Sequence, residues 1–237
     1  MQVAPGIHRI GSDVIAAYLV VTDAGITMVD AGVAGFWDDL VAELAGIGAE
    51  LADIRGMVLT HGDPDHIGIA DRVRRASGAR VHLHPADERH ARTGLPRMTR
   101  IGRPSLRHLA DTAPWAVRKG ILRRARVADT IPVADGDVLD LPGAPVIVAT
   151  PGHSPGSVSV HVPEVGALFV GDALSTRNAL SGVEGPRLAA FTGDVEQATA
   201  SLARLAPLDA QWVLPGHGAP WRGTPADAVA AALERRR

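Results

Sequence analysis

Four side chains that can bind a metal ion fall within six residues of this chain: His61, Asp63, Asp65 and His66. They follow the apolar residues 57–60, which predict a short strand. Gly62 and Pro64 interrupt the run, and proline lacks the amide hydrogen that a helix or a central strand requires. The run is therefore predicted to be a loop at the end of a strand, where functional side chains are common.

Three more segments repeat this design, because each places a His or Asp beside glycine directly after an apolar, strand-like run. The side chains concerned are His153, Asp172 and His217. Imidazole and carboxylate ligands, in a chain that has no cysteine, suit zinc, manganese or iron. Seven candidate ligands exceed what one tetrahedral ion needs and fit two ions that share a bridging carboxylate.

Strand-like and helix-like segments follow a similar order in the two halves of the chain. Short β-branched runs bounded by turns predict strands over residues 7–10, 14–21, 25–29, 57–60, 80–84, 138–141, 146–150, 157–162, 167–170 and 211–214. Apolar spacing and capping residues predict helices over residues 36–47, 67–76, 194–205 and 224–236. This order favours an α/β chain with two sheets covered by helices, and 237 residues suit a single domain.

The segment 85–126 differs from the rest in charge, because it carries eleven Arg and Lys residues against three acidic residues. The whole chain has a net charge of −2, so its other parts are strongly acidic. We interpret residues 85–130, approximately, as a basic helical insertion between two core strands. It is either a helix pair with a solvated arginine face or a lid whose arginines bind an anionic substrate.

These motifs, in this order, resemble the metallo-β-lactamase superfamily, whose signature is His-x-His-x-Asp-His followed by a distant His, a bridging Asp and a last His. The resemblance covers essentially the whole chain, from Asp30 to the glycine-flanked last His. It implies a four-layer αββα sandwich over residues 1–237, with a dinuclear metal site at one edge of the two sheets. It also implies the ligands: His61 and His153 for the first ion, Asp65, His66 and His217 for the second, and Asp172 as the bridge.

Asp63 is the departure from this signature, because the family has its second His there. If Asp63 coordinates, the first ion gains a carboxylate ligand, which lowers its Lewis acidity and favours Mn²⁺ or Fe²⁺ over zinc. If Asp63 is too short to reach, the first site is weak and the second ion works alone. The flavodiiron branch of the superfamily also has a carboxylate at this position. Asp30 resembles the family's aspartate that orients a metal ligand.

The resemblance implies a metal-dependent hydrolase with two divalent ions, most readily zinc, with Mn and Fe as alternatives. A metal-bridging hydroxide would attack an ester, thioester, lactone or amide carbonyl, and Asp65 would orient this nucleophile and carry a proton. Residues 150–157 are similar to the corresponding stretch of glyoxalase II-like thioesterases, which favours a small, anionic thioester or ester. A di-iron or mono-iron redox enzyme, a nuclease and an inactive binding protein are the alternatives.

Composition bears on partners and location. Aromatic residues make up 3% of the chain and the net charge is −2, so nucleic-acid binding is not expected. No apolar run approaches the roughly 18 residues of a membrane span. No targeting segment is evident, so we expect a cytoplasmic protein with a small-molecule substrate.

The other histidines, His90 among them, lack glycine-flanked positions and are interpreted as ordinary residues. Substrate-binding residues and the oligomeric state stay open.

Overall fold

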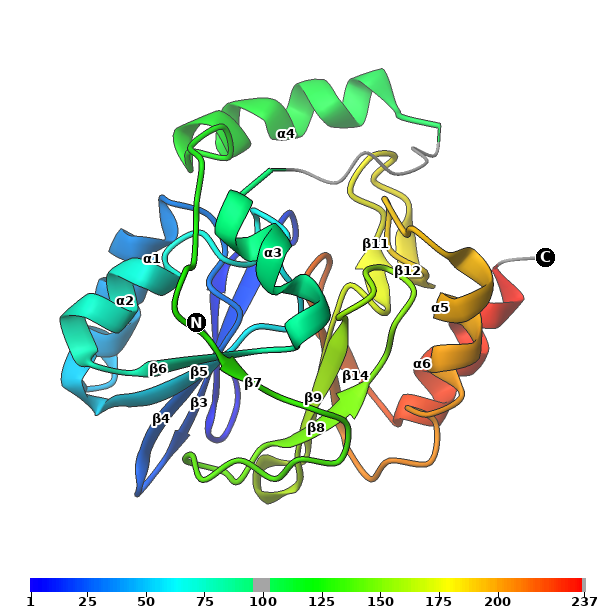
Figure 1. The fold of residues 1–237 in the computed structure, drawn as a ribbon. Coiled ribbons are helices and arrows are strands. Elements are labelled where there is room, and N and C mark those ends of the chain that lie inside the picture. The colour runs from blue at the N-terminus through cyan, green and yellow to red at the C-terminus, as the bar shows by residue number, and fades with distance from the viewer. Residues whose placement is uncertain (96–102, 236–237) are drawn as a thin grey trace.

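Two β-sheets pack face to face, and helices cover their outer faces, in the computed structural model, which describes residues 1–95 and 103–235 (Figure 1). The first sheet has seven strands in chain order. They are β1 (Gln2–Ala4), β2 (Ile7–Gly11), β3 (Ala16–Thr22), β4 (Gly25–Val29), β5 (Ile54–Val58), β6 (Arg80–Leu83) and β7 (Ile131–Pro132). Strands β1 to β4 pair antiparallel and β4 to β7 pair in parallel, so the carboxyl ends of β4 to β7 share one edge.

The second sheet has five strands in the spatial order β14-β13-β10-β9-β8. They are β8 (Val146–Ala149), β9 (Val158–Val162), β10 (Ala167–Gly171), β13 (Trp212–Pro215) and β14 (Trp221–Arg222). Strands β10 and β13 are parallel, and the other neighbours are antiparallel. Between β10 and β13 in the chain, β11 (Ser175–Arg177) and β12 (Glu184–Arg187) form a separate antiparallel pair.

The α-helices in the described part of the chain are α1 (Phe36–Gly46), α2 (Ala70–Ser77), α3 (Pro85–Thr93), α4 (Leu106–Arg118), α5 (Val195–Leu202) and α6 (Pro225–Glu234). Helices α1 and α2 pack on the outer face of the first sheet, and α5 and α6 pack on that of the second. Helix α6 begins as its sequence predicts, because the Thr224 hydroxyl accepts a hydrogen bond from the amide of Asp227. Helix α4 lies across one end of the sandwich, apart from both sheets (Figure 1).

Alternating side chains of the central strands fill separate cores on the two faces of each sheet. In β3, Tyr18 points into the core between the sheets and Leu19 points into the core under the first helices. In β10, Phe169 points between the sheets and Leu168 points toward α5 and α6. The Tyr18 and Phe169 rings meet between the sheets with centroids 5.3 Å apart. Three apolar layers thus hold four structural layers together, which confirms the predicted αββα class.

One predicted strand is wrong. Residues 138–141 form only an isolated bridge, between Val138 and Val146. The chain instead closes a turn, in which the amide of Ala144 donates to the carbonyl oxygen of Leu141 at 2.9 Å. Gly143 has a φ of 81° within this turn, a conformation that a continuing strand does not use.

The basic segment 85–126 lies between β6 and β7 and contains α3 and α4, while residues 96–102 lie outside the described part. None of the helices in the described part of the chain combines the length and the apolar character needed to cross a membrane.

Candidate metal centre

The four glycine-flanked segments lie just after β5 of the first sheet and after β8, β10 and β13 of the second. Their His and Asp side chains form three overlapping groups, and within each group the potential ligand atoms lie within 4.8 Å of one another. The groups are His61, Asp63 and His153; His61, His66 and Asp172; and Asp65, His66 and His217. All seven candidate ligands of the sequence therefore meet at one place.

Close approach of the loops explains why glycines flank the ligands. A Cβ atom on Gly216 would lie 2.4 Å from Cε1 of His66. A Cβ atom on Gly171, which has a φ of 48°, would lie 2.3 Å from the hydroxyl oxygen of Thr60. Any side chain at these two positions would push the loops of the two sheets apart.

The first group places Asp63 between two histidines. Its Oδ2 lies 3.1 Å from Nε2 of His153 and 3.5 Å from Nε2 of His61. The short carboxylate that replaces the second His of the signature therefore does reach the other two candidate ligands of this group.

The third group contains Asp65, whose Oδ2 lies 3.4 Å from Nε2 of His217, together with His66. Asp172, a member of the second group, lies between the first group and the third. Its Oδ1 is 3.5 Å from Nε2 of His66, and its Oδ2 is 3.4 Å from Nε2 of His217 and 3.6 Å from Nε2 of His153. A carboxylate in this position faces ligands of both groups.

Contacts behind the histidines fix which ring nitrogen faces the centre. Nδ1 of His66 lies 2.8 Å from Oδ2 of Asp30, and Nδ1 of His61 lies 3.0 Å from the hydroxyl oxygen of Thr60. Nδ1 of His217 lies 2.5 Å from the carbonyl oxygen of Val14. Each ring is therefore held by Nδ1 and presents Nε2 to its neighbours, the arrangement typical of metal-binding histidines.

Asp30, at the carboxyl end of β4, also ties this centre to the loop of residues 60–66, here called the motif loop. Its Oδ1 accepts hydrogen bonds from the backbone amide of Thr60 at 2.8 Å and from the Thr60 hydroxyl at 3.0 Å. Asp30 adopts a φ of 58°, which aspartate tolerates better than most residues. One buried carboxylate thus orients His66 directly and His61 through Thr60.

The Asp and His side chains of this centre shift one another's pKa values and so offset the effect of burial on their charges. Burial alone would raise the pKa of Asp172, but His217 and His66 hold that pKa well below its usual range. Burial alone would lower the pKa of His66, but the carboxylates of Asp30 and Asp172 raise it to about 9. Ionised carboxylates therefore favour protonation of the histidines here, and metal binding competes with protons at these rings.

Several buried polar atoms have no hydrogen-bond partner within the described residues. They include Nε2 of His61, Nε2 of His66 and Oδ1 of Asp172, which belong to the same group. Unpaired buried polar atoms are costly, so three that converge indicate a place for a ligand. Imidazole nitrogen and carboxylate oxygen are the ligand atoms that zinc, manganese and iron take, so the residues present fit divalent metal ions.

Two residues near this centre carry no signal in the sequence. His90 of α3, interpreted above as ordinary, places Nε2 at 2.9 Å from Oδ1 of Asp63, so the other oxygen of Asp63 faces His61 and His153. Asp87, in the first turn of the same helix, is fully buried. Its Oδ2 accepts from the amide of Gly62 at 2.9 Å and from the Ser154 hydroxyl at 2.6 Å.

Comparison with known proteins supplies the wider context. The sequence profile of the metallo-beta-lactamase superfamily matches residues 10–217. The probable metallo-hydrolase YflN of Bacillus subtilis is 27% identical over 236 residues, covering 94% of this chain and 87% of that protein. A hydroxyacylglutathione hydrolase of Hyphomonas neptunium is 31% identical over 116 residues, covering 48% of this chain and 32% of that protein. The crystal structure of a metallo-beta-lactamase family protein from Thermus thermophilus matches with a TM-score of 0.68 and 26% identity, covering 99% of this chain and 81% of that one.

Proposed function

This chain belongs to the metallo-β-lactamase superfamily, and from that membership we propose that it is a metal-dependent hydrolase acting on an ester, thioester, lactone or amide of a small molecule. The placement of Asp172 between two ligand groups carries this proposal. Two adjacent groups with a carboxylate between them suit a pair of ions acting on one substrate. The related proteins named as a metallo-hydrolase and a hydroxyacylglutathione hydrolase support hydrolysis, the latter a thioester in particular.

The proposed ligands divide between two ions. His61, Asp63 and His153 would hold the first, Asp65, His66 and His217 the second, and Asp172 would bridge them. When bound, two such ions would supply a water nucleophile at neutral pH and polarise the carbonyl oxygen under attack. Zinc suits this set, and the extra carboxylate of Asp63 makes manganese and iron its competitors.

Asp65 is the proposed catalytic carboxylate. It lines the cavity at the metal centre, and His66 and His217 lower its pKa although burial opposes this. A carboxylate that is ionised at neutral pH can orient a nucleophilic water and accept its proton. The proton can then pass to the leaving group, so Asp65 would serve as base and afterwards as acid.

Two arginines of the basic segment support an anionic substrate. Arg123 and Arg124 line the same cavity as Asp63, Asp65 and His153. Nε of Arg124 donates to the carbonyl oxygen of Thr93 at 2.8 Å, which fixes that side chain beside the cavity. Guanidinium groups placed in this way can bind a substrate carboxylate or phosphate at a distance from the reacting carbonyl.

A substrate panel tests the proposed reaction. The metal-loaded protein is expected to hydrolyse at least one of a p-nitrophenyl ester, an S-acyl glutathione thioester and a γ-lactone, and to lose that activity on chelation. Bis(p-nitrophenyl) phosphate tests the nuclease alternative in the same assay. Hydrolysis of the phosphodiester alone, or of none of the compounds by protein with bound metal, would contradict the proposal.

Redox chemistry is the second candidate, and Asp63 is the observation that favours it. A carboxylate ligand in the first group suits iron better than a third imidazole does. The two candidates differ in a simple measurement, because a hydrolase works with zinc or manganese and shows no colour change with oxidants. Two bound irons whose visible absorption changes on reduction would favour the redox enzyme.

A further inference from the structure

A cavity of about 680 Å³ opens directly onto the metal centre. Asp63, Asp65, His153, Asp172 and His217 form one part of its wall. Most of the other described residues in its wall are apolar and belong to α4, to the residues after α4 and to the chain around β11 and β12. Its volume suits a small organic molecule. A reacting group bound at the metal centre would therefore continue into an apolar space.

Helix α4 contributes a stripe of side chains to this space. Leu109, Thr112, Ala113 and Ala116 line the cavity, and their spacing places them on one face of the helix. No residue of α4 is buried within the described part of the chain. An apolar helix face that the described residues leave unburied is unfavourable in water unless something else covers it.

Both ends of α4 are fixed to the sandwich. At its start, the amide of Ser105 donates to the carbonyl oxygen of Leu180 at 3.1 Å. At its end, Nζ of Lys119 lies 2.7 Å from Asp39 of α1, and the amide of Gly35 donates to the carbonyl oxygen of Lys119 at 2.8 Å. The stripe is therefore held over the cavity by polar contacts at the ends of the helix.

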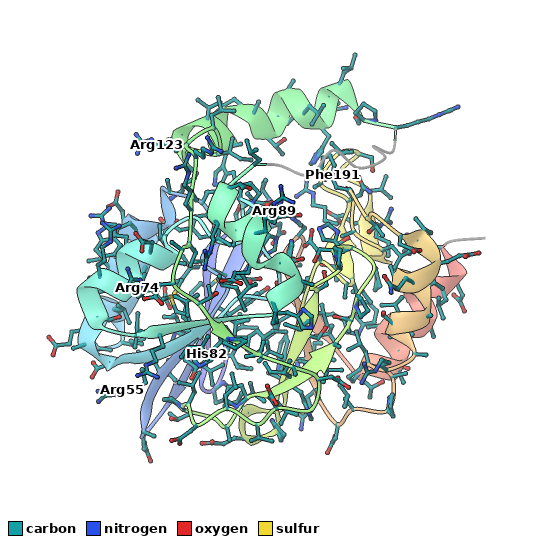
Figure 2. The ribbon with its side chains drawn as sticks, in the orientation of Figure 1. Arg55, Arg74, His82, Arg89, Arg123 and Phe191 are labelled. Carbon is teal, nitrogen blue, oxygen red and sulfur yellow. The ribbon has the colours of Figure 1, made fainter. Side chains whose placement is uncertain are left out.

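The opposite wall is also apolar. Ala179 and Leu180 line it between β11 and β12, and Ala190 and Phe191 line it after β12. Figure 2 shows Phe191 below α4, and Arg123 near the far end of that helix. The wall thus places hydrocarbon opposite the α4 stripe, with the arginines to one side.

We propose that this cavity binds an unbranched hydrocarbon chain on the acyl side of the scissile bond, so that the substrate is a fatty-acyl ester or thioester. This inference rests on the proposed hydrolase function and adds the substrate class. The reacting carbonyl lies at the metal centre, and the chain extends between α4 and the wall that contains Phe191. Each methylene moved from water into this space favours binding.

Chain length is the direct test, with p-nitrophenyl esters from acetate to decanoate and the metal-loaded protein. The value of kcat/KM is expected to rise about fourfold for each added CH₂ group until the chain fills the cavity. The Ala113→Trp variant, which fills the stripe, should lower the ratio of kcat/KM for the octanoate to kcat/KM for the acetate at least about tenfold. Ala110→Trp is the control, because Ala110 is on the same helix, is exposed and does not line the cavity.

A binding measurement separates this proposal from the reaction. Alkan-1-ols from butanol to decanol, which are not substrates, compete with the fluorescent probe 8-anilinonaphthalene-1-sulfonate on the metal-loaded protein. Tighter competition by longer alcohols, weakened by Ala113→Trp and not by Ala110→Trp, supports the cavity assignment even if no ester is hydrolysed. Values of kcat/KM that do not rise with chain length, or equal competition by butanol and octanol, would overturn it while leaving the hydrolase proposal intact.

Discussion

Replacing Asp172 by alanine is expected to lower kcat/KM for the best substrate of the panel by at least about 10³-fold, equivalent to about 4 kcal/mol of transition-state stabilisation. Asp172 faces His66, His153 and His217, so its carboxylate contacts both ligand groups. Without it, the two ions would lose their shared ligand. The bound metal per chain should therefore fall together with the activity.

The matched variants are Asp172→Asn, which keeps the shape but removes the charge, and Asp140→Ala, which removes an exposed aspartate elsewhere. We expect the Asn variant to behave like the Ala variant and the Asp140 variant to behave like the wild type. Circular dichroism checks that each protein is folded. An Asp172→Ala protein that retains wild-type activity would rule out a bridging role for this carboxylate.

Replacing Asp87 by alanine should lower the free energy of unfolding by about 3 kcal/mol or more. Its buried carboxylate accepts from the amides of Gly62 and Gly156 and from the hydroxyl of Ser154. Each donor left unpaired in the interior costs about 1–3 kcal/mol. For a chain of this size, the melting temperature should fall by about 6–12 °C.

Glu88→Ala is the control for this variant, because Glu88 is the next acidic residue in the same helical turn. Its carboxylate pairs with Arg92 at 2.6 Å on the surface, where such a pair contributes about 0.3–0.5 kcal/mol. We therefore expect the melting temperature of Glu88→Ala to stay within about 2 °C of the wild type. Equal shifts in the two variants would show that Asp87 does not hold the loop of Gly62 and the loop of Ser154 and Gly156 together.

Local sequence patterns predict the cluster of candidate ligands because each candidate has its signal beside it in the chain. His153, Asp172 and His217 each follow a strand and sit next to a glycine at which a Cβ atom would clash with a neighbouring segment. The alternation of apolar residues in the strands likewise reflects the two cores that each sheet separates. These features depend on neighbours in sequence, so one sequence is enough to read them.

The sequence does not predict contacts between residues that only tertiary packing brings together. His90 and Asp87 lie on a helix of the basic segment, and no motif in the neighbouring sequence predicts which residues they contact. They reach Asp63 and Gly62 only because α3 packs over the motif loop. The apolar stripe of α4 is hidden for the same reason, since the many arginines of the segment suggest a solvated surface.

The content of divalent metal per chain, measured on wild type and on Asp63→Ala purified without added metal, tests the central claim most directly. That claim is a two-ion centre in which Asp63 is a ligand of the first ion. It predicts about two ions in the wild type and about one in Asp63→Ala, with two retained in Asp63→His, which restores the signature. A wild type with one ion or none, unchanged by Asp63→Ala, would contradict the two-ion centre and the hydrolytic role proposed for it.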